Sequence, residues 1–108
     1  MVYLTLYVKD INTTIQFYTE KLELFNLLGD RRLVCKYGPQ LCLDIREADK
    51  THFIEFGIYF EEGISIISLL EKAKIQYTLK NDLGGSSVNF EDNSGNKVNL
   101  SCDCGELK

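Results

Sequence analysis

Positive charge is scarce in this sequence of 108 residues, which has 12 Lys and Arg against 16 Asp and Glu. The formal net charge is -4, and the isoelectric point is about 4.9. Arg31 and Arg32 form the only adjacent basic pair. Because a phosphate-binding face needs clustered Lys and Arg, the sequence argues against a nucleic-acid partner.

Long hydrophobic runs are also missing. No apolar stretch approaches the roughly 20 residues of a membrane-spanning helix, so we expect no membrane partner. The opening stretch MVYLTLYVKD has no basic segment before its apolar residues, which is typical of a strand rather than a signal peptide. These absences predict a cytoplasmic protein. The length and ordinary composition predict one folded domain over residues 1–108.

The four cysteines are Cys35, Cys42, Cys102 and Cys104. Without an export signal, reduced thiols are the expected state. A zinc site built from all four thiolates is the alternative. Structural zinc sites usually contain CxxC pairs, whereas this chain has the closer spacing Cys102-x-Cys104. The spacing favours free thiols.

Hydrophobic periodicity organises the first half of the chain. Residues 2–8 alternate between apolar and polar positions, which predicts a half-buried strand. Apolar residues then recur at helical spacing at Ile11, Ile15, Tyr18 and Leu22, with candidate N-caps at residues 12–14. Three further strands are predicted at residues 24–28, 32–37 and 41–45, the last two joined through Gly38-Pro39.

The second half repeats this order. A strand is predicted at 53–60, a helix at 64–73 with Ile64, Ile67, Leu70 and Lys74 along one stripe, and strands at 75–79, 86–90 and 97–101. The segment YLTLYV at residues 3–8 matches EFGIYF at residues 55–60 with an offset of 52. Such a repeat predicts a duplicated unit, neither copy of which buries its apolar face alone. The predicted fold is α+β, with tandem βαβββ modules over about 1–48 and 51–104.

Two stretches resemble the vicinal oxygen chelate superfamily, which includes glyoxalase I, extradiol dioxygenases, and fosfomycin and bleomycin resistance proteins. LYVKDINTTIQFYTEKLEL, residues 6–24, resembles its opening strand and D…FY…LG helix, and FEDNSGNKVNL, residues 90–100, resembles its F-x-D-P-x-G-N-x-x-x-L signature. Asn93 and Ser94 stand where the family usually has Pro and Asp or Asn. The resemblance covers nearly the whole chain. It implies curled mixed sheets around a cavity, with helices outside, in a protein that is commonly a homodimer.

Strand alternation predicts which side chains face that cavity. Leu4, Leu6, Val8, Phe56, Ile58, Phe60, Val98 and Leu100 are expected to point towards the helices. Cys42 is expected on the opposite face, together with the residues that we take as candidate ligand-binding positions: Tyr3, Thr5, Tyr7, Asp44, Glu55, Tyr59, Asn99 and Ser101.

The resemblance implies that metal ligands, if present, occupy Tyr3, Cys42, Glu55 and Asn99. Divalent metals prefer His, Glu, Asp or a deprotonated Cys, so Glu55 is the one natural ligand and Cys42 suits zinc. A tyrosine with an ordinary pKa of about 10 stays protonated at pH 7, and Asn99 offers an uncharged amide. We therefore expect no metal cofactor. A divalent metal held by Glu55 and Cys42 is the alternative.

Two further polar residues lie near these positions. His52, the only histidine, precedes Glu55 by three residues and points to the opposite face of an unbroken strand. The favoured interpretation is a solvated residue before the strand. The alternative is a β-bulge, which would turn the His52 side chain to the same face as Glu55. Asp44 follows Cys42 by two residues, and is either solvated or a ligand or general base beside Glu55.

Tyr3, Tyr7 and Tyr59, with Glu55 and Asp44, predict an aromatic and acidic cavity. Ring faces and carboxylates both attract positive charge, so such a cavity suits a small cationic or aromatic ligand. The alternative is that these tyrosines simply fill half-exposed sheet positions.

Three functions therefore stay open. The first, which the sequence favours, is a metal-independent small-molecule binding protein, because the metal positions are mostly lost while the cavity face stays polar and aromatic. The second is a divergent metal-dependent lyase or dioxygenase that uses Glu55, Cys42 or Asp44. The third is a ligand-free structural or regulatory module with a collapsed cavity. A homodimer is expected in each case, because pairing covers exposed sheet edges.

Overall fold

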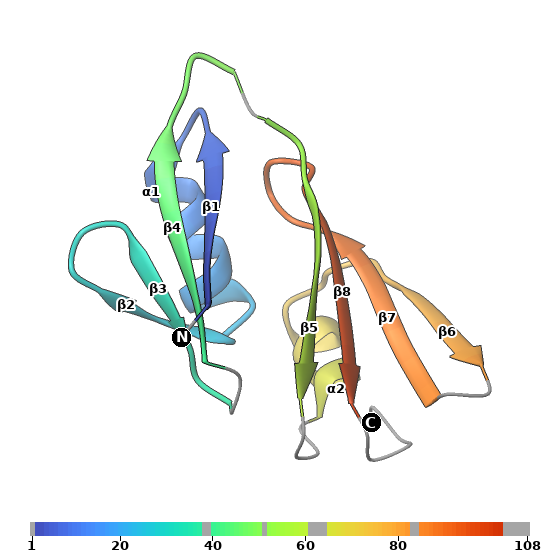
Figure 1. The fold of residues 1–108 in the computed structure, drawn as a ribbon. Coiled ribbons are helices and arrows are strands. Elements are labelled where there is room, and N and C mark those ends of the chain that lie inside the picture. The colour runs from blue at the N-terminus through green and yellow to red at the C-terminus, as the bar shows by residue number, and fades with distance from the viewer. Residues whose placement is uncertain (1, 38–39, 51, 61–64, 83–84, 103–108) are drawn as a thin grey trace.

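Two four-stranded sheets, each carrying its helices on one face, make up the computed structural model (Figure 1). The structure describes residues 2–37, 40–50, 52–60, 65–82 and 85–102. The first module contains β1 (Val2–Val8), α1 (Ile11–Gln16), the π-helical turn η1 (Phe17–Lys21), β2 (Phe25–Leu28), β3 (Arg32–Cys35) and β4 (Leu41–Glu47). The second contains β5 (Glu55–Phe60), α2 (Ile66–Lys72), β6 (Thr78–Asp82), β7 (Gly85–Glu91) and β8 (Lys97–Cys102).

The two sheets have equivalent strand orders, β1-β4-β3-β2 and β5-β8-β7-β6. In each sheet the module's first strand pairs parallel with its last, and the other pairs are antiparallel. The predicted duplicated βαβββ unit and the α+β class are therefore confirmed. No helix in the described part of the chain is long and apolar enough to cross a membrane.

The first helix differs from the prediction in its start and its geometry. Its N-cap is Asp10, not a residue of 12–14, because Asp10 has an extended backbone and its side chain accepts a hydrogen bond from Thr13 N at 3.0 Å. The last turn is π-helical, and Leu22 N donates to Phe17 O at 2.8 Å. A π-turn adds one residue per turn and so shifts the side chains that follow it.

The second helix begins at Ile66, and the predicted first stripe position, Ile64, lies outside the described residues, as do Gly38 and Pro39. Ile66 and Leu70 form its buried face, whereas Lys74 is exposed with a positive φ of 58°. Residues 75–77 have no regular secondary structure, so β6 starts three residues later than predicted.

The hydrophobic core lies on the helix side of both sheets. The predicted inward positions are confirmed: Leu6, Val8, Ile58, Phe60, Val98 and Leu100 are buried, and Leu4 and Phe56 are partly buried against the same core. They form one cluster with side chains of both helices, so the two modules share a core. This is why neither copy of the repeat buries its apolar face alone.

A buried polar network joins the modules at the turn between β7 and β8. Tyr18 Oη donates to Asp92 Oδ2 at 2.6 Å, and Asp92 also accepts from Ser94 N, Asn96 N and Asn96 Nδ2 at 2.9, 2.9 and 3.0 Å. Asn96 Oδ1 in turn accepts from Ile54 N at 3.0 Å, just before β5. Burial, with the Asp92 carboxylate beside it, raises the pKa of Tyr18 well above its ordinary 10.0, so the hydroxyl stays a donor. The polar turn thus fastens the second sheet to the first helix.

Candidate functional site

Each sheet has an open face on the side away from its helices, which lie behind the strands in Figure 1. On the first sheet, the register pairs Tyr3 with Cys42, Thr5 with Asp44, and Tyr7 with Arg46. The alternation that defined the predicted cavity face therefore holds on β1 and β4.

Two arginines give the first sheet's open face a charge that was not predicted. The Arg32 guanidinium lies 5.0 Å from the centroid of the Tyr3 ring, at cation–π distance. Arg46 Nη2 lies 3.0 Å from Asp44 Oδ2, so the carboxylate is already paired with a cation. Arg32 is opposite Asp44 in the β3–β4 register. The first open face is therefore not acidic, because two arginines accompany its one carboxylate.

The tyrosines of the predicted cluster are all about half exposed: Tyr3 58%, Tyr7 45% and Tyr59 49%. They come from different sheets, and the ring contact of Tyr7 is with His52, whose centroid is 5.4 Å away. His52 is exposed and precedes β5, which confirms the predicted solvated position. The half exposure of the tyrosines argues against a collapsed cluster, which the ligand-free interpretation requires.

The second sheet's open face is arranged in cross-strand rows of similar chemistry. In β5–β8–β7 order the rows are charged (Glu55, Lys97, Glu91), amide (Gly57, Asn99, Asn89) and hydroxyl (Tyr59, Ser101, Ser87). Lys97 Nζ lies 3.7 Å from Glu55 Oε1, and Asn99 Nδ2 donates to Asn89 Oδ1 at 2.9 Å. Thr78 of β6 extends the amide row, opposite Asn89.

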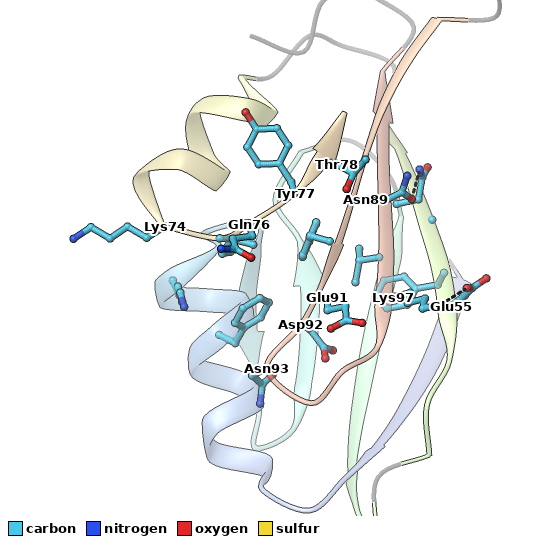
Figure 2. A pocket seen from close by; sticks show the side chains of 18 residues that line it. Glu55, Lys74, Gln76, Tyr77, Thr78, Asn89, Glu91, Asp92, Asn93 and Lys97 are labelled. Atoms are coloured by element: carbon cyan, nitrogen blue, oxygen red, sulfur yellow. Dashed lines mark hydrogen bonds and ion pairs between the residues drawn. The ribbon is translucent and has the colours of Figure 1, made fainter. Parts of the chain in front are cut away.

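A cavity of about 1100 Å³ borders this face (Figure 2). Its lining comes from both faces of the sheet: Glu55, Gly57 and Asn99 from the open face, and Phe56, Phe90 and Val98 from the helix side. It continues past residues 74–77 to Phe17 of η1. β6 pairs with β7 only as far as Asn89, so the edge of β7 beyond this residue is uncovered by β6. The volume is of the order of known small-molecule sites.

The structure brings two predicted site residues into this cavity, Glu55 and Asn99. The other six lie on the open faces but do not line it: Tyr3, Thr5, Tyr7, Asp44, Tyr59 and Ser101. Sequence reasoning missed Gly57, Asn89 and Lys97, although strand alternation applied to β7 and β8 would have found the last two. It had no signal for residues 74–77, which were assigned to a helix end and a strand.

The donor set implied for a metal is divided between the sheets. Cys42 is 1% exposed beside Tyr3 in the first sheet, whereas Glu55 and Asn99 are in the second and already have partners. Within the described ranges, no group of three or more His, Cys, Asp and Glu side chains is placed to hold a metal. These residues do not fit a divalent metal in one chain.

The structure also argues against a zinc site built from all four cysteines. Cys42 pairs with Val34 in the β3–β4 register, so Cys35 and Cys42 point to opposite faces of the first sheet. Partial burial raises the pKa of Cys35, which disfavours its thiolate. The side chain of Cys102 and the whole of Cys104 lie outside the described residues.

Comparison of the sequence with family models and with curated proteins finds no match. The fold, by contrast, is similar to known structures. One is a glyoxalase/bleomycin resistance protein from Streptomyces sp. CB03234, with a TM-score of 0.77 and 19% identity over 92% of this chain and 96% of that one. Another is an antibiotic binding protein from the same organism, with a TM-score of 0.77 and 18% identity over 93% and 92%.

A lactoylglutathione lyase from Agrobacterium tumefaciens is also similar, with a TM-score of 0.66 and 21% identity over 94% of this chain and 92% of that one. At these identities the likeness establishes the fold. The three structures include both a binding protein and an enzyme, so the fold does not decide between these functions.

Proposed function

We propose that this chain, which has the glyoxalase/bleomycin resistance fold of the vicinal oxygen chelate superfamily, is a metal-independent small-molecule binding protein. Its ligand occupies the cavity beside the second sheet. The proposal rests on the size and the lining of this cavity, which is large enough for a small molecule and is lined in part by polar side chains. In place of a metal-ligand set, this lining has the Asn89–Asn99 amide pair and the Glu55–Lys97 ion pair.

The charges and rings around the cavity suggest the class of ligand. Glu55 and Glu91 lie on either side of Lys97 in the register, so this row carries one net negative charge. Phe17 and Tyr77 add aromatic surface to the wall. The whole lining is balanced, because Lys21 and Lys74 also border the cavity and Asp92 is its third carboxylate. An uncharged aromatic compound suits these surroundings, since the charges balance and the rings favour a flat apolar body. The similarity to an antibiotic binding protein supports a small-molecule ligand.

Divalent metals are expected to leave the stability of the purified, metal-stripped protein unchanged. A ligand that binds the folded state raises the melting temperature, so zinc, nickel, manganese and iron(II) should each produce a shift within error. The measurement is thermal melting with and without each ion. A shift of several degrees that is absent in Glu55→Gln would instead support a metal-dependent enzyme with Glu55 as a ligand.

We propose that the protein binds its ligand as a homodimer. Tyr3, Tyr7, Leu28 and Tyr59 are each at least 45% exposed on the open faces, which a second copy would cover. Sedimentation equilibrium should give twice the chain mass of 12.4 kDa. Tyr3→Glu should shift the equilibrium towards monomer, whereas Ser68→Glu, an exposed change on α2 and so on the helix side, is the matched control. A monomer at all concentrations would contradict the proposal.

A further inference from the structure

The Asn89–Asn99 pair lines the cavity, and Asn99 lies opposite Gly57, the one position of β5 that has no side chain. Asn99 is half-buried and Asn89 is exposed. Their carboxamides come from adjacent strands that are opposite each other in the β7–β8 register, which holds both groups at one place on the face. Figure 2 shows Asn89 beside Thr78 on the wall of the cavity.

The pair has unused hydrogen-bonding capacity. A carboxamide has two N–H donors and an oxygen with two lone pairs, and the 2.9 Å bond between the two side chains uses one donor and one lone pair. Within the described residues, neither side chain has another hydrogen-bond partner. The pair therefore presents both donors and acceptors to the cavity.

Gly57 leaves space for a ligand next to this pair. A Cβ built at Gly57 would lie 3.7 Å from Asn99 Oδ1 and 3.6 Å from Asn99 O, at ordinary contact distance. The space that a side chain would fill at this position therefore borders the amide oxygen directly. Glu55 and Tyr59, two residues away on either side, flank it along β5.

We propose that the Asn89–Asn99 pair recognises a planar ligand group with an adjacent N–H and C=O, as in a lactam, an imide or an aryl carboxamide. This inference rests on the proposed function of the cavity. Such a group can both donate to and accept from the pair, and a flat ring can lie over Gly57. A ketone, an ether or a carboxylate lacks the donor. A polar site rejects an analogue that leaves its groups unpaired.

The experiment is a titration of ¹⁵N-labelled, metal-stripped protein with two uncharged probes of similar shape. Quinolin-2-one has the lactam N–H, and 2-methoxyquinoline lacks it. We expect both to shift the Gly57 amide resonance, with quinolin-2-one binding about tenfold more tightly, the effect of roughly one net hydrogen bond. Quinolin-2-one should also shift the side-chain NH₂ resonances of Asn89 and Asn99.

Variants separate the pair from the rest of the cavity. Asn99→Leu and Asn89→Leu each keep the approximate size of the side chain but remove its donors and its acceptor, and should remove most of the preference for the lactam. Asn26→Leu, an exposed change on β2 of the first sheet, is the matched control and should leave the preference intact.

Two results overturn the inference in distinguishable ways. If both probes shift Gly57 with equal affinity, the amide pair is not a recognition element, although the cavity still binds ligands. If neither probe shifts Gly57 or any other cavity residue, the inference fails, and thermal melting with other aromatic compounds then decides whether the proposed function fails with it. The comparison of the two probes needs only the unmodified protein, so it holds even where a variant fails to fold.

Discussion

Replacing Asp92 with Ala is expected to lower the free energy of unfolding by about 3–5 kcal/mol, the cost of breaking a buried charged network. The carboxylate is 7% exposed and accepts four hydrogen bonds. Its removal leaves the Tyr18 hydroxyl and the Asn96 amide groups without their acceptor in a buried region. It also releases the turn that fastens the second sheet to the first helix. Chemical denaturation followed by circular dichroism measures the change.

Two controls show whether the network or only one contact carries this effect. Tyr18→Phe removes a single one of the four hydrogen bonds, so it should cost about 1–2 kcal/mol. Glu91→Ala, an exposed change next to Asp92, should lie within about 0.5 kcal/mol of the unmodified protein. An Asp92→Ala protein as stable as Glu91→Ala would contradict the account of how the modules are joined.

Replacing Gly57 with Val is expected to weaken ligand binding at least about tenfold while leaving the fold intact. A Cβ at this position meets its neighbours at 3.6–3.8 Å, which is ordinary contact, and β-branched residues suit strands. The free energy of unfolding should therefore stay the same or rise by up to about 1 kcal/mol. The new methyl groups occupy the space beside Asn99, so affinity for quinolin-2-one should fall at least about tenfold, which corresponds to a loss of about 1.4 kcal/mol.

Ser87→Val is the matched control for this prediction. It adds similar bulk to the same open face but lies in the hydroxyl row, outside the cavity lining. Isothermal titration calorimetry on both variants gives the comparison. Unchanged affinity in Gly57→Val would place the ligand elsewhere, and equal loss in both variants would point to a general disturbance of the sheet.

Most of the fold could be predicted from the sequence because its signals are local. Alternation in residues 2–8 and 55–60 identifies the first strand of each module, and the repeat places both in equivalent positions. The errors arose where local signals compete. Residues 12–14 include good capping side chains, but Asp10 has the extended backbone that a cap requires. Residues 75–77 are apolar enough for a strand, yet they have no strand partner.

The site was less predictable, because it depends on which residues become neighbours across strands. Arg32 and Arg46 carry no signal in the sequence, and only the register places them around Asp44 and Tyr3. Likewise, the sequence marks Asn99 only as a weak substitute for a metal ligand. Its partner on β7 becomes visible only when β7 and β8 are aligned, and the two amides then form an uncharged recognition surface.

The central claim is that the second-sheet cavity binds an aromatic small molecule without metal. Thermal melting of the metal-stripped protein with a panel of uncharged and cationic aromatic compounds tests it most directly, with Gly57→Val measured alongside. The account predicts that at least one compound raises the melting temperature of the unmodified protein by several degrees and has little effect on the variant. If no compound does so, while a divalent metal stabilises the protein and Glu55→Gln removes that effect, the account is contradicted.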